Sequence, residues 1–209
     1  LVMAADLRVV FIKLADRLHN MQTLKYLPLQ KQRENAKETL EIYAPLAERL
    51  GMGEIKGQLE DLAFPYLYPQ EYAKLQHDSR SFYVSAEKYI RDFKSQLLQL
   101  LLSKHVAAAL DARRKHLYSL WRKLQRPEID GDLNKIYDLF AARVLVSSVE
   151  DCYLALGAIH GTWHPVPYLG VSDFIANPKP NGYRSIHTKV FDPQGKIVEI
   201  QIRTHEMHG

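Results

Sequence analysis

Residues 186–204 read I-H-T-K-V-F-D-P-Q-G-K-I-V-E-I-Q-I-R-T and predict a β-hairpin. Two alternating runs flank Asp192-Pro193-Gln194-Gly195, which suits a type I turn with Gly195 in the left-handed region, followed by a bulge. The predicted pairs are Lys189 with Glu199, His187 with Gln201, Ser185 with Arg203, Ile186 with Ile202, Thr188 with Ile200, and Val190 with Val198. A two-residue loop would shift the register by one and move Glu199 to the core side. The pattern therefore selects the bulged turn, with one apolar and one polar face.

The segment before the hairpin is rich in turn residues and cations. From Asp173 to Ser185 it reads D-F-I-A-N-P-K-P-N-G-Y-R-S. Its loop ends at Tyr183, whose ring can stack on a base, while Lys179 and His187 can meet phosphates. The alternative is a plain connection with a packed tyrosine. Together with the hairpin's polar face, the segment is typical of a site for a phosphorylated, base-bearing ligand.

The composition indicates a globular protein with anionic partners. Of 209 residues, 46% are hydrophobic and 25% are charged, and the net charge is +4. The single cysteine, Cys152, excludes an internal disulfide and a thiolate zinc cluster, which fits a reducing compartment, with the cytoplasm as the default. The longest apolar run, Leu97–Leu110, is broken by polar residues, so we expect neither a membrane span nor a membrane partner. Because Leu1 is not a start methionine, we read the chain as a piece of a longer protein.

Hydrophobic spacing predicts helices first and mixed structure afterwards. The expected helical stretches are Leu1–Leu27, Gln32–Leu50, Gly53–Leu62 and a long block over Pro69–Leu110, with breaks at Pro28, Gly51 and Pro65. Beyond about Asp111 we expect a basic helix, a strand Arg143–Ser147, a helix Val149–Thr162 and the hairpin. The fold class is therefore α+β or mixed α/β, with a helical N-terminal segment followed by a sheet flanked by helices.

The run Arg113–Arg126, R-R-K-H-L-Y-S-L-W-R-K-L-Q-R, is interpreted as a basic helix. At ~100° per residue its cations form one stripe and its apolar residues another, so Trp121 is expected to be buried. The basic stripe consists of Lys115, Ser119, Arg122, Lys123 and Arg126. It is either a solvated face or a cradle for successive phosphates. An RNA-binding face is a further alternative.

Two carboxylates, Asp138 and Glu199, are candidate magnesium ligands and catalytic residues. Asp138 precedes the predicted strand Arg143–Ser147, and alone it would be a cap or turn residue. Paired with Glu199 on a neighbouring sheet element, among basic residues, it can hold Mg²⁺ between a triphosphate and an acceptor hydroxyl.

A second polar pair, Asp16 and Asn20, lies at i and i+4 on the first predicted helix. Residues in this pattern usually face solvent. No matching set of histidines accompanies them, so a metal site at Asp16 would be incomplete in this chain.

These residues resemble the RelA/SpoT family, whose enzymes make and break the guanosine tetra- and pentaphosphate alarmones, (p)ppGpp. The motifs that carry the resemblance are I-K-L-A-D-R-L-H-N-M over Ile12–Met21, the basic run Arg113–Lys123, P-K-P-N-G-Y-R-S-I-H-T over Pro178–Thr188 and E-I-Q-I-R-T over Glu199–Thr204. The resemblance implies three segments. Residues 1–30 are the C-terminal remnant of an HD-type hydrolase domain, 31–69 a helical linker bundle, and 70–209 a nucleotidyltransferase-like synthetase domain, truncated at its C-terminus.

The activity that the resemblance implies is that of a Mg²⁺-dependent GTP pyrophosphokinase in the stringent response, which transfers pyrophosphate from ATP to the 3′-hydroxyl of GDP or GTP. Asp138 and Glu199 would handle Mg²⁺, and Glu199 would activate the hydroxyl. The implied ATP-binding residues are Arg113, Lys115, Ser119, Lys123 and Arg143, with the two arginines flanking adenine. The implied GDP or GTP ligands are Lys179, Asn181, Tyr183 and His187, with Tyr183 stacked on guanine. On the hydrolase side, Asp16 would bind metal (Mn²⁺ in the parent protein) and Asn20 would contact nucleotide.

Departures from the family pattern leave alternatives open. Gly170, Val171 and Ser172 precede Asp173 where the family usually carries two basic residues, and Arg114 stands where a small residue or proline is common. Losing charged contacts to a triphosphate weakens turnover by about a decade or more. The chain is thus an active synthetase, a regulatory guanine-nucleotide-binding module with a weakened synthetase, or part of a (p)ppGpp 3′-pyrophosphohydrolase. Ribosomes and regulatory domains are candidate partners of the part beyond Gly209.

Overall fold

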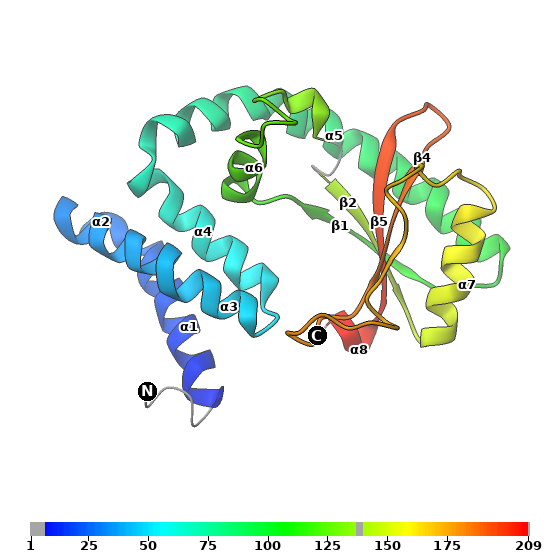
Figure 1. Ribbon diagram of the computed structural model, residues 1–209, viewed down its shortest axis with the longest axis horizontal. Helices are drawn as coiled ribbons and strands as arrows, with labels where there is room; N and C mark the ends of the chain where they lie inside the picture. The colour runs from blue at the N-terminus through cyan, green and yellow to red at the C-terminus, as the bar shows by residue number, and fades with distance from the viewer. Residues whose placement is uncertain (1–6, 137–139, 209) are drawn as a thin grey trace. The chain divides into compact units, whose positions relative to one another are not determined.

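The computed structural model describes residues 7–136 and 140–208. The chain divides into two compact units, one formed by Leu1–Asp78 with His116–Arg126 and the other by Ser79–Lys115 with Pro127–Gly209. The first unit is helical and the second contains a β-sheet (Figure 1). Among the described residues, no helix combines the length and apolar character that a membrane crossing requires. The predicted fold class is confirmed.

Short helices build the first unit. They are α1 (Leu7–Gln22), the 3₁₀ turn η2 (Leu24–Tyr26), α2 (Leu29–Glu38), the π-helical turn η3 (Thr39–Tyr43), α3 (Ala44–Arg49), α4 (Gly53–Leu67) and α6 (Leu117–Leu124). Their shared core includes Leu14, Met21 and Leu59. The break expected at Pro65 is wrong, because α4 continues through it to Leu67. Ala63, just before the proline, is fully buried in this core, and tertiary packing of this kind offsets the hydrogen bond that proline lacks.

Helix α6 packs on α4 through a ring cluster and one carboxylate. The half-buried Trp121 ring lies 5.1 Å from Phe64 between centroids, so its expected burial is confirmed only in part. Asp61 accepts hydrogen bonds from His116 Nδ1 and from the backbone N–H of Tyr118, both at 2.9 Å. Gly57 lies directly beneath the imidazole, where a Cβ would come within 2.1 Å of its Cδ2 atom. Asp61 thereby anchors the start of α6.

Helix α5 (Pro69–Ser103) ends earlier than the predicted helical block. His105 takes a left-handed φ of 59°, and the Val106 N–H reaches back to the Leu101 carbonyl at 2.9 Å. This is the hydrogen-bond pattern of a helix C-cap, and it turns the chain out of the helix. Strand β1 (Ala109–Arg114) follows, so the helical prediction for 109–110 is wrong.

The prediction of one basic helix over Arg113–Arg126 is also wrong. Arg113 and Arg114 are the last residues of β1, which pairs with β2, and only Leu117–Leu124 is helical, as α6. Non-local strand pairing overrides the local helical pattern here. Lys115 and His116 form the link between the two elements. Of the predicted stripe, only Ser119, Arg122 and Lys123 lie on the helix.

Within the described part of the second unit, the sheet has five strands in the order β1-β2-β5-β4-β3. Besides β1, they are β2 (Phe140–Val146), β3 (Ser172–Asp173), β4 (Ile186–Phe191) and β5 (Ile197–Thr204). Strands β2 and β5 run parallel, and the other neighbours are antiparallel. The unit also contains most of α5, the 3₁₀ turn η4 (Leu133–Lys135) and the helices α7 (Val149–His160) and α8 (His205–His208).

The hairpin β4–β5 has the predicted register from Ile186 to Val190, whereas Ser185, predicted to pair with Arg203, lies outside β4. Lys189 pairs with Glu199, His187 with Gln201 and Ile186 with Ile202. The Gly195 N–H donates to the Asp192 carbonyl at 2.9 Å, and Gly195 has a φ of 77°. This confirms the type I turn with a left-handed glycine.

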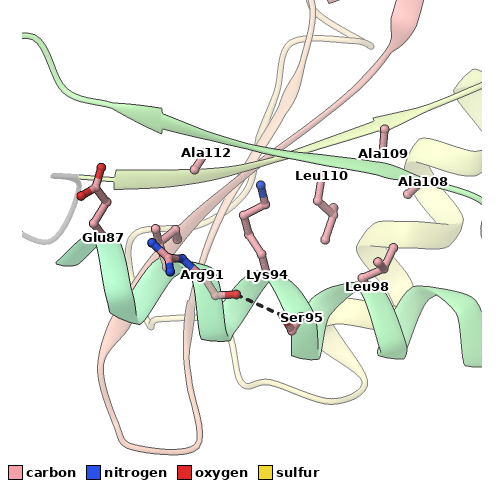
Figure 2. Close-up of a pocket in the computed structure, with 10 residues that line it drawn as sticks. Glu87, Arg91, Lys94, Ser95, Leu98, Ala108, Ala109, Leu110 and Ala112 are labelled. Atoms are coloured by element: carbon pink, nitrogen blue, oxygen red, sulfur yellow. Dashed lines mark hydrogen bonds between the residues drawn. The ribbon is translucent and has the colours of Figure 1, made fainter. Parts of the chain in front are cut away.

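Helices α5 and α7 cover the apolar face of the sheet (Figure 1). On that face Ile200, Ile202 and Ile186 are fully buried. Between α5 and the edge strand β1 lies a cavity of about 500 Å³, whose lining includes Lys94 and Leu110 (Figure 2). The helices therefore leave the polar strand face to carry chemistry.

We expect Asp192→Ala to destabilise the protein by about 3 kcal/mol, measured by urea unfolding. The Asp192 carboxylate accepts hydrogen bonds from the backbone N–H groups of Gln194 and Lys196, at 2.8 and 2.7 Å, and from Tyr89 Oη at 2.5 Å. Tyr89→Phe removes only the last of these and should cost about 1.5 kcal/mol. Equal effects of the two variants would show that the turn does not depend on the carboxylate.

Candidate functional site

Four strands place polar side chains on one face of the sheet. Residues that pair directly across neighbouring strands share a face, and alternate residues of one strand do so as well. The registers Asp111↔Arg143, Arg143↔Gln201 and His187↔Gln201 therefore align one polar set. Its members are Asp111 and Arg113 of β1, Arg143 of β2, His187 and Lys189 of β4, and Glu199, Gln201 and Arg203 of β5.

Glu199 is the acidic residue at the centre of this face. Its side chain is 15% exposed. Gln201 Nε2 donates a hydrogen bond to Glu199 Oε1 at 2.9 Å, and His187 Nδ1 lies 3.8 Å from the same oxygen. One carboxylate oxygen is thereby held by the neighbouring amide.

A tight turn holds the predicted acceptor-binding residues. The Gly182 N–H donates to the Lys179 carbonyl at 2.8 Å, and Gly182 takes a φ of 76°, which favours glycine. Asn181 Oδ1 accepts a hydrogen bond from the backbone N–H of Tyr183 at 3.1 Å. Lys179 Nζ lies 4.6 Å from the centroid of the Phe174 ring and 5.4 Å from that of Tyr183. The turn thus brings the Lys179 ammonium group and the Asn181 amide close to Tyr183, with the Phe174 ring beside them.

Tyr183 and His187 are in direct contact. Tyr183 Oη lies 2.8 Å from His187 Nε2, and the two rings meet edge to face at 5.8 Å. Phe174 meets the His187 ring edge to face as well, at 5.4 Å. These contacts fix the orientation of the imidazole between Tyr183 and Glu199.

Burial lowers the pKa of His187 to about 4. Glu199 opposes this shift, whereas the positive charges of Lys179, Arg203 and Arg113 add to it. The imidazole is therefore neutral at pH 7. Toward a phosphate it can act as a hydrogen-bond donor, but it does not supply a positive charge.

Three arginines make this face cationic. Arg143 Nη1 is paired with Asp111 Oδ2 at 3.2 Å. Arg203 Nη2 lies 2.6 Å from His208 Nδ1 of α8, and burial followed by the charges of Arg143 and Arg113 lowers the Arg203 pKa. Among the described residues, the buried Nε atoms of Arg143 and Arg203 and the Oε1 atom of Gln201 have no hydrogen-bond partner. Buried polar atoms in this condition are typical of a site that a polar ligand completes.

Sequence reasoning assigned no role to Asp111, Gln201 or Arg203. Gln201 and Arg203 alternate with Glu199 along one strand. This period of two could have placed both residues on the same face as Glu199 from the sequence alone. Asp111 was not identifiable, because its pairing with Arg143 depends on β1 being a strand.

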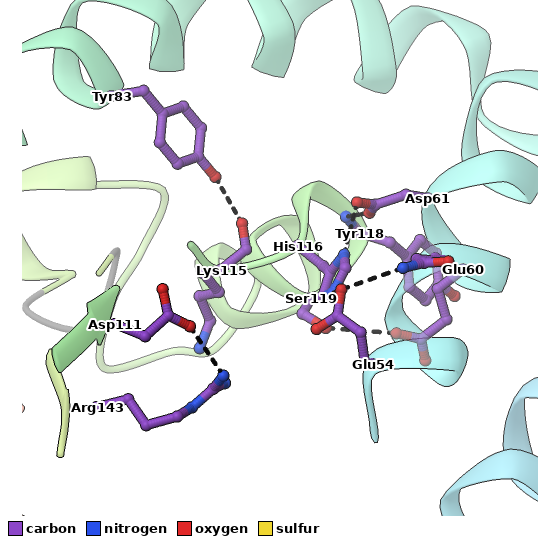
Figure 3. A network of polar contacts seen from close by, with 11 residues as sticks. Glu54, Glu60, Asp61, Tyr83, Asp111, Lys115, His116, Tyr118, Ser119 and Arg143 are labelled. Atoms are coloured by element: carbon purple, nitrogen blue, oxygen red, sulfur yellow. Dashed lines mark hydrogen bonds and ion pairs between the residues drawn. The ribbon is translucent and has the colours of Figure 1, made fainter. Parts of the chain in front are cut away.

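The other predicted ATP-binding residues lie at and beyond the end of β1. In the second unit, Tyr83 Oη donates to the Lys115 carbonyl at 3.0 Å (Figure 3). The Arg114 guanidinium lies 3.6 Å from the Tyr83 ring centroid. In the first unit, Ser119 Oγ donates to Glu60 Oε2 at 3.3 Å, and Lys123 lies one turn further along α6. Burial raises the pKa of Glu60.

Asp138, the predicted second carboxylate, lies outside the described residues. Within 7–136 and 140–208, no group of three or more histidine, cysteine or carboxylate side chains could hold a metal ion. The predicted pairing of Asp138 with Glu199 therefore stays a prediction.

On α1, Asp16 and Asn20 do lie together. Asn20 Nδ2 donates to Asp16 Oδ2 at 3.1 Å. Asn20 also lines a cavity of about 340 Å³ with Arg17 and Asn35, whose side chains are hydrogen-bonded at 3.3 Å.

The segment that departs from the family pattern runs along the edge of the sheet. Gly170 has a φ of 59°, and Ser172 pairs with His187 in the short strand β3. Asp173 Oδ1 accepts hydrogen bonds from the N–H groups of Ile175 and Ala176, both at 2.9 Å. Asp173 is thus a turn residue, and the exposed Ser172 lies beside the polar face.

Comparison with known proteins identifies the family. Residues 112–209 match a model described as a region found in RelA / SpoT proteins, and residues 1–53 match an HD domain model. The chain is 48% identical to a GTP pyrophosphokinase of Streptomyces antibioticus over 99% of its own length and 24% of that protein's. The chain belongs to the RelA/SpoT family.

Other RelA/SpoT relatives carry two different names. A GTP pyrophosphokinase of Escherichia coli K12 is 44% identical over 100% of this chain and 28% of its own length. A guanosine-3′,5′-bis(diphosphate) 3′-pyrophosphohydrolase of Aquifex aeolicus is also 44% identical, over 100% of this chain and 30% of its own length. The chain therefore spans about a quarter of the length of the curated relatives it matches.

A solved RelA/SpoT-like structure shares the fold. Small alarmone synthetase 1 of Bacillus subtilis, in a crystal structure bound to its product pppGpp, aligns with a TM-score of 0.51 at 23% identity. The alignment covers 63% of this chain and 76% of that chain. The fold of the mixed sheet with its flanking helices is thus shared with a solved structure.

We expect the His187 imidazole to titrate with a midpoint near 4, measured by NMR of its ring signals. Its pKa is about 6.5 in the unfolded chain, so protonation favours the unfolded state as the pH falls from about 6.5 to 4. His187→Gln lacks this effect. The free energy of unfolding of the wild type, relative to that of the variant, should therefore be highest above pH 6.5 and fall through this window. A constant difference would mean that the imidazole is solvated.

Proposed function

We propose that the chain carries the catalytic part of a GTP pyrophosphokinase, which makes (p)ppGpp by moving the β,γ-pyrophosphate of ATP to the 3′-hydroxyl of GDP or GTP. The observation that carries the proposal is Glu199, a largely buried carboxylate on a strand face otherwise rich in cations. Family membership and the names of the Streptomyces and Escherichia relatives support the same reaction.

The acceptor nucleotide is proposed to bind at the turn before β4. Tyr183 stacks on guanine, and Asn181 and Lys179 contact the sugar and phosphates. The neutral His187 lies between the Tyr183 hydroxyl and Glu199 and completes this set of acceptor-binding residues. The support for this site is geometric. Lys179 lies over the Tyr183 ring, and the Tyr183 hydroxyl contacts His187, which is a neighbour of Glu199. Guanine affinity from such a stack amounts to roughly 1 to 3 kcal/mol.

The donor nucleotide is proposed to bind the residues that the resemblance to the family implies. Arg113 and Arg143 flank adenine, and Lys115, Ser119 and Lys123 hold the phosphates. The ion pair between Arg143 and Asp111 supports this role, because it holds a planar guanidinium in a fixed orientation that suits stacking on a base.

Glu199 is proposed to act as the general base. It takes the proton of the 3′-hydroxyl, whose oxygen forms a bond to the β-phosphorus while the bond from that phosphorus to the α-phosphate oxygen breaks, and AMP leaves. The reaction asks the protein for positioning and charge neutralisation more than for covalent chemistry. A strand-borne carboxylate among arginines meets that demand.

The residues present fit Mg²⁺. Magnesium in such sites takes one or two carboxylates together with substrate phosphate oxygens, and Glu199 offers the oxygen that Gln201 does not hold. We propose Glu199 and Asp138 as its ligands. An ion held by these two carboxylates would supply positive charge that favours the transfer of the pyrophosphate.

The proposed organisation of the chain follows from the family. Residues 1–30 are assigned to the end of an HD-type hydrolase domain, 31–69 to a helical linker bundle and 70–209 to the synthetase domain. We propose that the protein acts in the cytoplasm on ATP and GDP or GTP. Ribosomes or regulatory domains are proposed as partners of the remaining part of the protein.

Two alternatives rest on particular observations. Gly170 and Ser172 supply no charge beside the polar face, which favours a nucleotide-binding module with weakened chemistry. The Asp16–Asn20 pair beside a cavity favours a 3′-pyrophosphohydrolase activity of the whole protein, with Mn²⁺ at Asp16, and the name of the Aquifex relative agrees.

Glu199→Gln is expected to reduce AMP release from ATP plus GDP by about 10²- to 10⁴-fold, because the base is lost while the side-chain volume is kept. Calorimetry should show GDP binding within a few-fold of wild type. Glu150→Gln, at an exposed acid in the first turn of α7, is the matched control and should leave the rate unchanged. A Glu199→Gln variant that keeps its rate would exclude this mechanism.

Ser172→Lys is expected to lower the KM for GDP by about tenfold, because Ser172 pairs with His187 on the proposed acceptor side and a charged contact to phosphate contributes roughly 1.5 kcal/mol or more. Ser172 is exposed at the sheet edge, so the new side chain needs no rearrangement. Ser172→Gln controls for size without charge. If Lys and Gln have the same effect, the missing charge does not limit the synthetase.

A further inference from the structure

The proposed base-stacking ring and the proposed catalytic carboxylate are joined by a row of polar contacts. Tyr183 Oη lies 2.8 Å from His187 Nε2, and His187 Nδ1 lies 3.8 Å from Glu199 Oε1. Gln201 Nε2 holds the same Oε1 atom from the other side at 2.9 Å. The row runs from the turn before β4 across the strand pair β4–β5.

The chemistry of the end groups sets the direction of the hydrogen bonds. An ionised carboxylate can only accept, and a neutral imidazole has one donor and one acceptor nitrogen. With Glu199 facing Nδ1, the proton is favoured on Nδ1, and Nε2 is left as an acceptor for the Tyr183 hydroxyl. Both contacts are then favourable, whereas the other tautomer would set a lone pair against the carboxylate. Glu199 therefore favours the tautomer that presents an N–H to it, and the Tyr183 hydroxyl stabilises this tautomer by donating to Nε2.

We propose that Tyr183 and His187 form a relay that orients Glu199 for proton abstraction from the acceptor hydroxyl, so that the tyrosine hydroxyl contributes to kcat while its ring contributes to nucleotide binding. The inference rests on the proposed function and deepens it. His187 is a positioning residue in this scheme, acting through Glu199 rather than as a phosphate ligand.

The surroundings of the relay support a fixed geometry. Phe174 meets both the Tyr183 and the His187 ring edge to face, at 6.2 and 5.4 Å. The step from His187 to Glu199, at 3.8 Å, is longer than a hydrogen bond of up to about 3.2 Å. A small rotation of the Glu199 side chain closes it, and catalytic contacts commonly tighten in this way once substrate is bound. The contacts of Phe174 thus restrict the rotation of the His187 ring.

Tyr183→Phe separates the two roles of the tyrosine, because the ring stays and the hydroxyl is lost. The expected result is a fall in kcat of about tenfold, the equivalent of one lost hydrogen bond, with a KM for GDP within about twofold of wild type. If Tyr183 only stacks on guanine, kcat stays at the wild-type value. Tyr168→Phe is the control, since that side chain is fully exposed at 105% and should change neither constant.

Two substitutions at His187 test which nitrogen matters. The amide nitrogen of His187→Asn stands near the position of Nδ1 and can still donate to Glu199, whereas that of His187→Gln stands near Nε2 and cannot. The expected order of kcat is wild type, then Asn, then Gln, with Asn at least about fivefold above Gln. In the Asn background, Tyr183→Phe should have little further effect, because the relay is already cut at Nε2.

The outcomes separate this inference from the proposed function. If the wild type forms AMP only when both ATP and GDP are present, the pyrophosphokinase activity is supported. This result does not depend on the outcome for the relay. Given that activity, an unchanged kcat in Tyr183→Phe overturns the relay. The relay is also overturned if the two His187 variants have the same kcat and both have a raised KM for GDP, and His187 is then a nucleotide ligand. A wild type that binds GDP by calorimetry without turnover overturns the proposed function, and the relay with it.

Discussion

The parallel pairing of β5 with β2 is the interaction on which the rest of the second unit depends. It sets Arg143 opposite Gln201, and through the antiparallel neighbours it brings Asp111 and His187 onto the same face. A shift of one residue would send Glu199 to the face covered by α5 and α7, where Ile200 now lies. The fully buried isoleucines of β4 and β5 make that shift costly, since burying each such side chain contributes about 2 kcal/mol. The hydrophobic face therefore determines where the polar face places its charges.

The polar face is itself unusually enclosed for so charged a surface. Arg143 and Arg203 are each 9% exposed, and atoms of both lack partners among the residues that the structure describes. Desolvated cations close to one another oppose folding. An arrangement of this kind is stabilised when an anion arrives, and a triphosphate can satisfy several guanidinium groups at once. The same feature that weakens the free protein thus favours the binding of an anionic ligand.

The sequence was sufficient for the hairpin and insufficient for strand β1. Alternation over residues 186–204 and a turn with Gly195 are local signals, and the whole register followed from them. Arg113 and Arg114 carry an equally clear helical pattern, yet they pair with a strand some thirty residues away, and no local period reveals such a partner. His105 is likewise an uncommon residue for a left-handed helix cap. The acidic, aromatic and basic candidates of the hairpin were therefore identifiable, while Asp111 needed the strand order.

The glycine beneath His116 has a consequence for interpreting variants of this protein. Any side chain at position 57 would meet the imidazole and push it away from Asp61, which also holds the first turn of α6. Ser119 is the third residue of the same helix. Substitutions at Gly57 would consequently disturb the start of α6, which lies far from Gly57 in the sequence. The effect of such a substitution would be conformational, because it would pass through His116 and Asp61 to the first turn of α6.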